Sequence, residues 1–223
     1  QQDFIDGKKP DGCKRCWIQE DAGVKSKRQL DYERHKSNFD SIDLRSKEFK
    51  NISIAFGNIC NLACRICGPG ASSRWATLLG KIENKKYPIH KWFQDKKIMQ
   101  DIILNTKEAF HLDVPGGEPL LVEIKEHYQY LEQLIKNGTA KNISLHYTTN
   151  GTTFPKVEHL ELWNKFKEVD LQISIDDIEE RYEYNRWPAK WPQVYNNLKK
   201  YQLLSKNNKQ IRLSLSFTVS AFT

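Results

Sequence analysis

Short apolar runs alternate with longer amphipathic segments from residue 51 to the end of the chain. The runs that predict β-strands are residues 51–56, 109–114, 142–149, 169–176 and 211–220. The segments that predict helices are residues 71–83, 95–105, 119–136, 156–167 and 178–205, because their apolar positions recur at three- and four-residue steps. This alternation predicts right-handed crossovers and a parallel sheet, either doubly wound or curled into a barrel.

The two ends of the chain differ from this pattern. The last predicted strand runs almost to Thr223 with no helix behind it. Parallel strands normally have covering helices, so we expect the chain to end before the domain does. Residues 1–48 are polar and charged, and their "DGCKRC" predicts a turn-like knuckle. We therefore predict an N-terminal extension over residues 1–48 and an α/β core over residues 49–223.

Composition narrows the class of protein. Hydrophobic residues make up 39% of the 223 residues, which is enough to build a core in a chain of this length. No apolar run approaches the roughly 18 residues of a membrane span. The net charge of +7 is compatible with acidic partners, nucleic acid among them. However, the lysines of "NLKKYQLLSKNNKQ" alternate with apolar residues as on a solvated helix face, and no nucleic-acid-binding motif accompanies them.

The five cysteines form two groups, Cys13 with Cys16, and Cys60 with Cys64 and Cys67. Secreted disulfide proteins are usually shorter and carry an even number of cysteines, so we predict a reducing, cytoplasmic environment. Structural zinc prefers four closed ligands, and the three-cysteine group supplies one too few. A four-iron cluster held by three thiolates, with one iron open, explains the spacing better, although a zinc site remains an alternative.

Each motif that could carry chemistry directly follows a predicted strand. The cysteine loop follows residues 51–56, "PGGEPLL" follows 109–114, "NGT" follows 142–149, and "DD" follows the apolar part of 169–176. In parallel α/β folds the C-terminal ends of the strands form one face, where ligands bind. Segments far apart in the sequence are therefore predicted to meet at one site.

The stretch "CNLACRIC" resembles the C-x₃-C-x₂-C signature of the radical S-adenosylmethionine (SAM) superfamily, and "GGEPLL" resembles its glycine-rich motif. The resemblance extends from about residue 50 to the end. Together with these motifs, "TTNGT" and "SIDD" resemble the branch whose members carry a C-terminal SPASM or twitch domain. One position departs from the family pattern, because Ile66 stands where an aromatic residue usually precedes the third cysteine. An apolar contact to adenine is retained there, but stacking is lost.

The resemblance implies a fold, a cofactor and a reaction. The fold would be a partial (β/α)₆ barrel, similar to a TIM barrel, that ends near the fifth strand. A [4Fe-4S] cluster on Cys60, Cys64 and Cys67 would chelate SAM and cleave it reductively to methionine and a 5′-deoxyadenosyl radical, which abstracts hydrogen from a substrate. An electron donor such as flavodoxin or ferredoxin would be needed. Peptides or proteins are the substrates that the branch suggests, with nucleic acid less favoured.

The resemblance also assigns residues to the SAM site. Gly116 and Gly117 would let the backbone approach SAM and accept hydrogen bonds from its ammonium group, while Glu118 would add a compensating negative charge. Asn150, with Gly151, either contributes to this site or forms an ordinary β-turn.

Further contacts are expected at the ends of the later strands. Ser174 and Asp176 alternate on one side of their strand and would contact the ribose hydroxyls or the methionyl end. Arg186 would pair with the SAM carboxylate, unless it is a surface arginine on a helix. Val219 or Ser220 would lie near adenine, whereas His111 is expected to pack inside its strand.

Cys13 and Cys16 form a C-x-x-C pair with no second pair nearby to close a site. They could bind zinc or part of an auxiliary iron–sulfur cluster. The alternative to an enzyme is a zinc-stabilised binding module, for example for RNA, whose barrel performs no chemistry.

Overall fold

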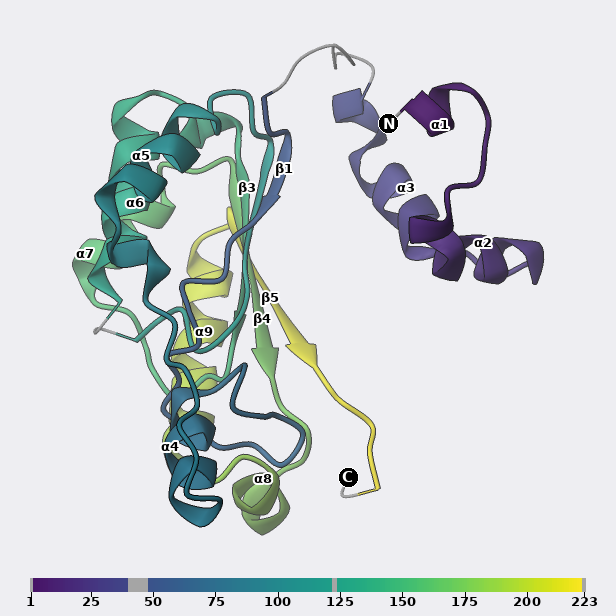
Figure 1. Cartoon of the computed structure of the whole chain (residues 1–223). Coiled ribbons are helices and arrows are strands. Elements are labelled where there is room, and N and C mark those ends of the chain that lie inside the picture. Colours follow the sequence, from purple (N-terminus) through teal and green to yellow (C-terminus); the bar gives the residue numbers. More distant parts are fainter. Residues whose placement is uncertain (1, 40–47, 122–123, 222–223) are drawn as a thin grey trace. The chain divides into compact units, whose positions relative to one another are not determined.

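The computed structural model describes residues 2–39, 48–121 and 124–221 (Figure 1). The chain divides into two compact units, Gln1–Lys47 and Glu48–Thr223, and each is described by itself. No helix among the described residues is long and apolar enough to cross a membrane.

The N-terminal unit is helical. Its elements are α1 (Gln2–Ile5), η1 (Asp11–Cys13), α2 (Lys14–Asp21) and α3 (Lys27–Phe39). Arg28 lies over the ring of Trp17, 4.6 Å from its centroid, and forms an ion pair of 2.6 Å with Glu20. The turn-like knuckle predicted for "DGCKRC" is wrong, because α2 begins inside it and contains Cys16.

The second unit is built on a five-stranded parallel sheet. Its strands are β1 (Asn51–Ser53), β2 (His111–Val114), β3 (Ser144–Thr149), β4 (Glu168–Ser174) and β5 (Ile211–Ser216). They lie in sequence order, and each pairs in parallel with the next. A doubly wound sheet reverses its strand order at a switch point, so this order corresponds to part of a (β/α) barrel, as predicted.

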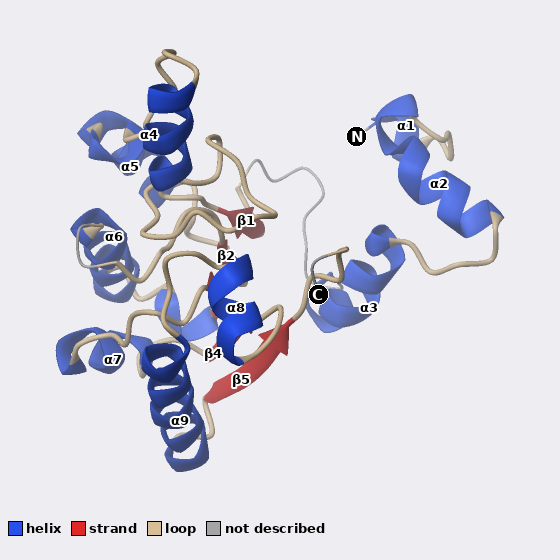
Figure 2. Ribbon diagram, turned by 90° about the horizontal axis from the view of Figure 1, so that it is seen from below, coloured by secondary structure: helices blue, strands red, loops and turns tan. Residues whose placement is uncertain are grey.

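Helices connect the strands and cover one side of the sheet. They are α4 (Ser73–Ile82), η2 (Trp92–Gln94), α5 (Lys96–Leu104), α6 (Lys125–Lys136), η3 (Ala140–Asn142), α7 (Val157–Trp163), α8 (Glu179–Asn185) and α9 (Trp191–Asn207). Viewed from below, α4, α5, α6, α7 and α9 form an arc around the strands (Figure 2). In Figure 1 the strands point toward α4 and α8, which lie at the C-terminal edge of the sheet.

The core lies between the strands and this arc of helices. Burial alternates along β2, β3 and β4, and the buried positions are mainly aliphatic or aromatic. At the centre, Tyr147 of β3 is hydrogen-bonded through its hydroxyl to His127 of α6, at 2.6 Å, and to Trp163 of α7, at 3.3 Å. Three elements are thereby joined in an apolar environment, where satisfied polar groups help to define the packing.

The opposite face of the sheet is polar, and it is called the concave face below. Because strand side chains alternate, the half-exposed positions of β2, β3 and β4 all lie on it. They are His111 and Asp113, then Ser144, His146 and Thr148, then Glu168, Asp170, Gln172 and Ser174. No apolar side chain of these three strands faces this side.

Several predicted boundaries were wrong. The helix predicted over 178–205 is two helices, because Pro188 lies between them and cannot continue a helix. Pro192 lies in the first turn of α9, where proline is tolerated. The helix predicted over 119–136 begins only at Lys125. The strand predicted over 211–220 ends at Ser216, where Thr218 donates its N–H to Asp176 instead of extending the sheet.

Candidate functional site

The cysteine loop between β1 and α4 is held in place by buried polar side chains. Asn58 is 1% exposed and donates from Nδ2 to the carbonyls of Pro69 and Pro88, at 2.9 and 3.1 Å. Ser72 caps α4 by accepting from the N–H of Trp75 and donates at 2.5 Å to the carbonyl of Leu62. An N-cap serine satisfies otherwise unpaired helix N–H groups, so the start of α4 also fixes the middle of the loop.

The three thiols of this loop interact with one another. The hydrogen bond between the thiols of Cys64 and Cys67 raises the pKa of Cys64 and lowers that of Cys67 to about 7. Burial raises the pKa of Cys60 to about 11, and the charge of Cys67 adds to this effect. Convergent thiols of one short loop are the ligands that a [4Fe-4S] cluster requires, so the donor set fits such a cluster with one iron free of protein ligands.

The glycine-rich loop after β2 packs directly against the cysteine loop. Gly117 has φ +54°, and a Cβ there would lie 2.4 Å from the carbonyl oxygen of Ile59. The next residue, Glu118, donates its N–H to that same carbonyl at 2.8 Å. Only glycine allows this approach in the left-handed region, so Gly117 serves the contact between the two loops.

Glu118 joins the glycine-rich loop to the end of β3. Its side chain is completely buried, and its carboxylate accepts from the N–H of Leu120 (3.1 Å), the hydroxyl of Thr149 (2.7 Å) and the N–H of Asn150 (2.6 Å). Burial raises the pKa of Glu118, and these hydrogen bonds oppose the shift. The carboxylate thus braces the backbone of the site, in addition to any electrostatic role toward a ligand.

Asn150 connects a third loop to the cysteines. Its Nδ2 donates to Oδ1 of Asn61 at 2.9 Å and lies 3.9 Å from the sulfur of Cys60. Its Oδ1 accepts from the N–H and the hydroxyl of Thr152, at 2.9 and 2.6 Å. The segment is therefore a turn that is tied to the cysteine loop, and the contribution of Asn150 to a SAM site stays a prediction.

The segment after β4 carries a buried ion pair between the strand end and the end of α8. Asp176 and Arg186 are 7% and 6% exposed, and their side chains approach to 2.9 Å. Arg186 ends α8, and its guanidinium adds to the effect of Cys64 in lowering the pKa of the Cys67 thiol. β4 ends at Ser174, so Asp176 lies beyond the strand in which it was predicted. Arg186 is not a surface arginine, because it lies buried beside the cysteines.

The remaining predicted residues differ in exposure and position. Val219 is 92% exposed and Ser220 half-buried, both beyond the end of β5. Ile66 is 42% exposed. His111 does not pack into the core, since it lies on the concave face with its ring centroid 6.4 Å from that of His146.

Cys13 and Cys16 belong to the N-terminal unit, separately from the other three cysteines. Both are half-buried, Cys13 at the start of α2 and Cys16 within it. Among the described residues, no three His, Cys, Asp or Glu side chains, the three cysteines of the loop included, converge on one point as a single metal ion would require. A [4Fe-4S] cluster binds each thiolate through a different iron and does not require that convergence.

Sequence reasoning missed four residues that hold the loops together: Asn58, Asn61, Thr149 and Thr152. Asn58 and Asn61 flank the first cysteine, while Thr149 and Thr152 flank Asn150 in "TTNGT". These four residues could have been found in the sequence as polar residues next to the predicted ligand motifs. A loop at a strand end needs side chains that form hydrogen bonds with its backbone.

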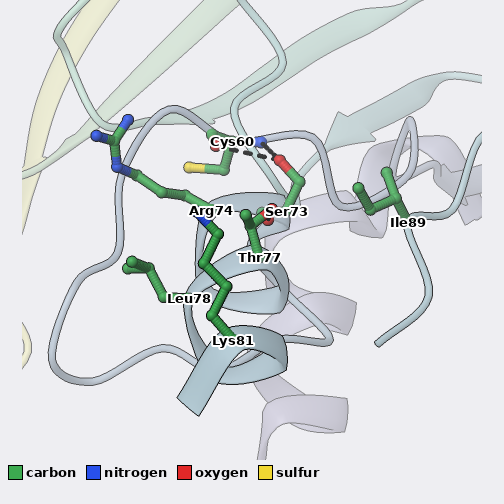
Figure 3. A pocket seen from close by; sticks show the side chains of 7 residues that line it. All are labelled: Cys60, Ser73, Arg74, Thr77, Leu78, Lys81 and Ile89. Carbon is green, nitrogen blue, oxygen red and sulfur yellow. Dashed lines mark hydrogen bonds between the residues drawn. The ribbon is translucent and has the colours of Figure 1, made fainter. Parts of the chain in front are cut away.

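A cavity of about 450 Å³ opens beside Cys60 on the side of α4 (Figure 3). Its walls are Cys60, Ser73, Arg74, Thr77, Leu78, Lys81 and Ile89. The hydroxyl of Ser73 is hydrogen-bonded to the backbone of Cys60. This cavity and the strand-end loops are both adjacent to the first cysteine.

The comparisons with known proteins agree with this geometry. The family model described as the radical SAM superfamily matches residues 54–213, more than half of the chain. The chain belongs to the radical SAM superfamily. The family match covers the three cysteines, the loops after β2 and β3, and strands β2 to β4, and it ends within β5. No curated protein sequence is significantly similar to the chain.

The chain also matches solved structures. Native anSMEcpe with bound AdoMet is 17% identical with a TM-score of 0.50, over 73% of this chain and 43% of that one. SuiB of Streptococcus suis bound to S-adenosylmethionine is 13% identical with a TM-score of 0.42, over 87% of this chain and 47% of that one. The chain spans less than half the length of both proteins.

Proposed function

We propose that this chain forms the catalytic core of a radical SAM enzyme. The observation that carries the proposal is the convergence of three thiols with the glycine-rich and "TTNGT" loops at one edge of the sheet. A [4Fe-4S] cluster on Cys60, Cys64 and Cys67, once reduced, would supply the electron for cleavage of SAM to methionine and a 5′-deoxyadenosyl radical that abstracts hydrogen from a substrate.

The protein residues would position the reactants and exclude water. The backbone carbonyls of Gly116 and Gly117 would accept hydrogen bonds from the SAM ammonium group, and Arg186 would pair with the SAM carboxylate. Ser174 would contact the SAM ribose or its methionyl end from the last position of β4, with Asp176 oriented by its ion pair. Val219 or Ser220 would approach adenine from the segment after β5.

The motifs "TTNGT" and "SIDD" support placement in the SPASM or twitch branch, and with it a peptide or protein substrate. The reaction also requires a one-electron donor protein of the flavodoxin or ferredoxin kind. Five free cysteines support a reducing, cytoplasmic location.

The test is anaerobic reconstitution of the chain with iron and sulfide, followed by reduction with dithionite in the presence of SAM. We expect about four iron and four sulfide per chain and formation of 5′-deoxyadenosine. Cys60→Ser, Cys64→Ser and Cys67→Ser should each abolish that product, because each removes a ligand of the same cluster.

Cys13→Ser and Cys16→Ser are the matched controls, since they remove the same chemical group from the other unit. Both should retain 5′-deoxyadenosine formation. Stoichiometric zinc without sulfide in the wild-type protein would instead favour a zinc-stabilised binding module. Undiminished SAM cleavage in the Cys60, Cys64 and Cys67 variants would show that these cysteines do not hold the cluster.

A further inference from the structure

The side chains on the concave face are unusually polar for the interior of a small barrel. Interior positions of such barrels are generally filled with branched apolar side chains. Here the inward positions of β2, β3 and β4 are all polar, as described above. A wall of this kind is not packed as a core, so it faces water or a polar ligand.

Three side chains on this wall form one hydrogen-bonded chain across three strands. Ser53, Asp113 and His146 are successive partners in the strand register. The hydroxyl of Ser53 donates to Oδ2 of Asp113 at 2.9 Å, and Nδ1 of His146 lies 2.7 Å from Oδ1. The side chains of His146 and Asp113 are 21% and 27% exposed, so they are shielded but still accessible.

The hydrogen bond to Asp113 determines which nitrogen of the His146 ring carries the proton. Burial raises the pKa of Asp113, but the hydrogen bonds from His146 and Ser53 outweigh it and leave the pKa lowered. An ionised carboxylate only accepts hydrogen bonds, so Nδ1 of His146 carries the proton. In the neutral ring Nε2 then keeps its lone pair and can accept a proton.

The same strands that carry this pair also carry the candidate SAM site. Asp113 lies three residues before Gly116, and His146 lies four residues before Asn150. At about 3.3 Å per residue, Asp113 and His146 lie on the order of 10 Å below the strand-end loops. A molecule that extends from those loops along the wall would therefore reach Nε2.

We propose that Asp113 and His146 form a proton-accepting pair that holds a polar O–H or N–H group of the substrate. This role rests on the proposed function. Nε2 accepts a hydrogen bond from that group. If the group ionises, its X–H bond breaks with the electron pair left on X, and a new N–H bond forms at Nε2. Asp113 stabilises the resulting imidazolium, which returns the proton to water, so no oxidant is needed.

Other charged groups face His146 from the neighbouring strands. His111 lies beside it on β2, Asp170 is its register partner on β4, and Arg212 of β5 follows Asp170 on the same row. Arg212 is 2.9 Å from Glu168. Asp170 is therefore the comparison residue for Asp113, because it is also a carboxylic acid next to His146 but is not the hydrogen-bond partner of Nδ1.

The experiment uses the full chain reconstituted with its cluster and needs no turnover of SAM. Diethyl pyrocarbonate acylates an unprotonated imidazole nitrogen, and mass spectrometry gives the rate at His146 at a fixed, mildly alkaline pH. We expect acylation of His146 and none at His127, whose side chain is fully buried. Asp113→Asn should lower the acylation rate at His146, because the carboxylate no longer holds the proton on Nδ1 and leaves the Nε2 lone pair free.

Asp170→Asn is the matched control and should change the acylation rate at His146 much less. Equal changes in the two variants, or an unreactive His146, would overturn the proposal while leaving the proposed SAM chemistry intact. ¹⁵N-histidine NMR of the wild-type chain gives an independent readout that does not depend on variant folding. It should show the proton of neutral His146 on Nδ1, and a proton on Nε2 would overturn the assignment.

Discussion

At the scale of single residues, one buried carboxylate holds two loops of the site together. Glu118 accepts three hydrogen bonds within a fully buried environment. Glu118→Gln replaces one accepting oxygen with an amide NH₂ group, which cannot accept from the N–H or O–H groups that face it. We expect a loss of about 1–3 kcal/mol in the free energy of unfolding, the cost of unsatisfied buried groups, measured by urea denaturation.

The control for this prediction is Glu158→Gln on α7, where the side chain is 68% exposed. A surface substitution of this kind should change stability by less than about 0.5 kcal/mol. Equal effects of the two substitutions would show that Glu118 does not brace the loops. Loss of SAM cleavage should accompany only the Glu118 change.

The lowered pKa of Asp113 predicts a pH-dependent contribution to stability. Because the folded-state pKa lies below the unfolded value, ionised Asp113 stabilises the protein above the unfolded value of about 4, and this contribution disappears as pH falls through the folded value. At pH 7 the wild type should exceed Asp113→Asn by about 1–2 kcal/mol. Urea unfolding at a series of pH values should show this difference shrinking below about pH 4. A difference that stays undiminished well below pH 4 would contradict the assignment.

At the scale of elements, the contact between two loops depends on a single glycine. Gly117→Ala would place a Cβ 2.4 Å from the Ile59 carbonyl at φ +54°. Gly138→Ala is a matched control, because Gly138 has φ +73° and nothing lies within 4 Å of the position that its Cβ would take. Both variants incur backbone strain of about 1–2 kcal/mol, but only Gly117→Ala also forces the loops apart.

We therefore expect Gly117→Ala to be the more destabilising of the two in urea unfolding and to reduce the iron bound after reconstitution. Gly138→Ala should bind iron as the wild type does. Similar iron content and stability for both variants would show that the loops adjust independently of each other.

The sequence predicts elements better than it predicts contacts. Apolar periodicity located all five strands and the sequential α/β pattern, because burial against helices selects for it. It merged α8 with α9, since the apolar spacing continues past Pro188 and Pro192. The contacts of Asn58, Glu118 and Asn150 could not be predicted from the sequence, because they join segments that only the folded sheet brings together.

At the scale of the whole molecule, the three candidate cluster cysteines and the other two lie in different units. Each unit has its own internal packing, and residues 48–223 contain strands β1 to β5 and the hydrophobic core. A separately expressed 48–223 chain should therefore fold and, after reconstitution, bind as much iron and sulfide as residues 1–223 do. Two thiolates alone are too few for a [4Fe-4S] cluster, so the removal of Cys13 and Cys16 should not reduce the amount of bound iron and sulfide.

Iron and sulfide analysis of both chains, with circular dichroism as a check on folding, decides between two arrangements. Equal iron per chain would confine the cluster to Cys60, Cys64 and Cys67. A reproducible loss of iron from a folded 48–223 chain would mean that Cys13 and Cys16 ligate metal, and Cys13→Ser and Cys16→Ser in the full chain should then reproduce that loss. If the shorter chain failed to fold, the stability of the sheet would depend on residues 1–47, contrary to the division into two units.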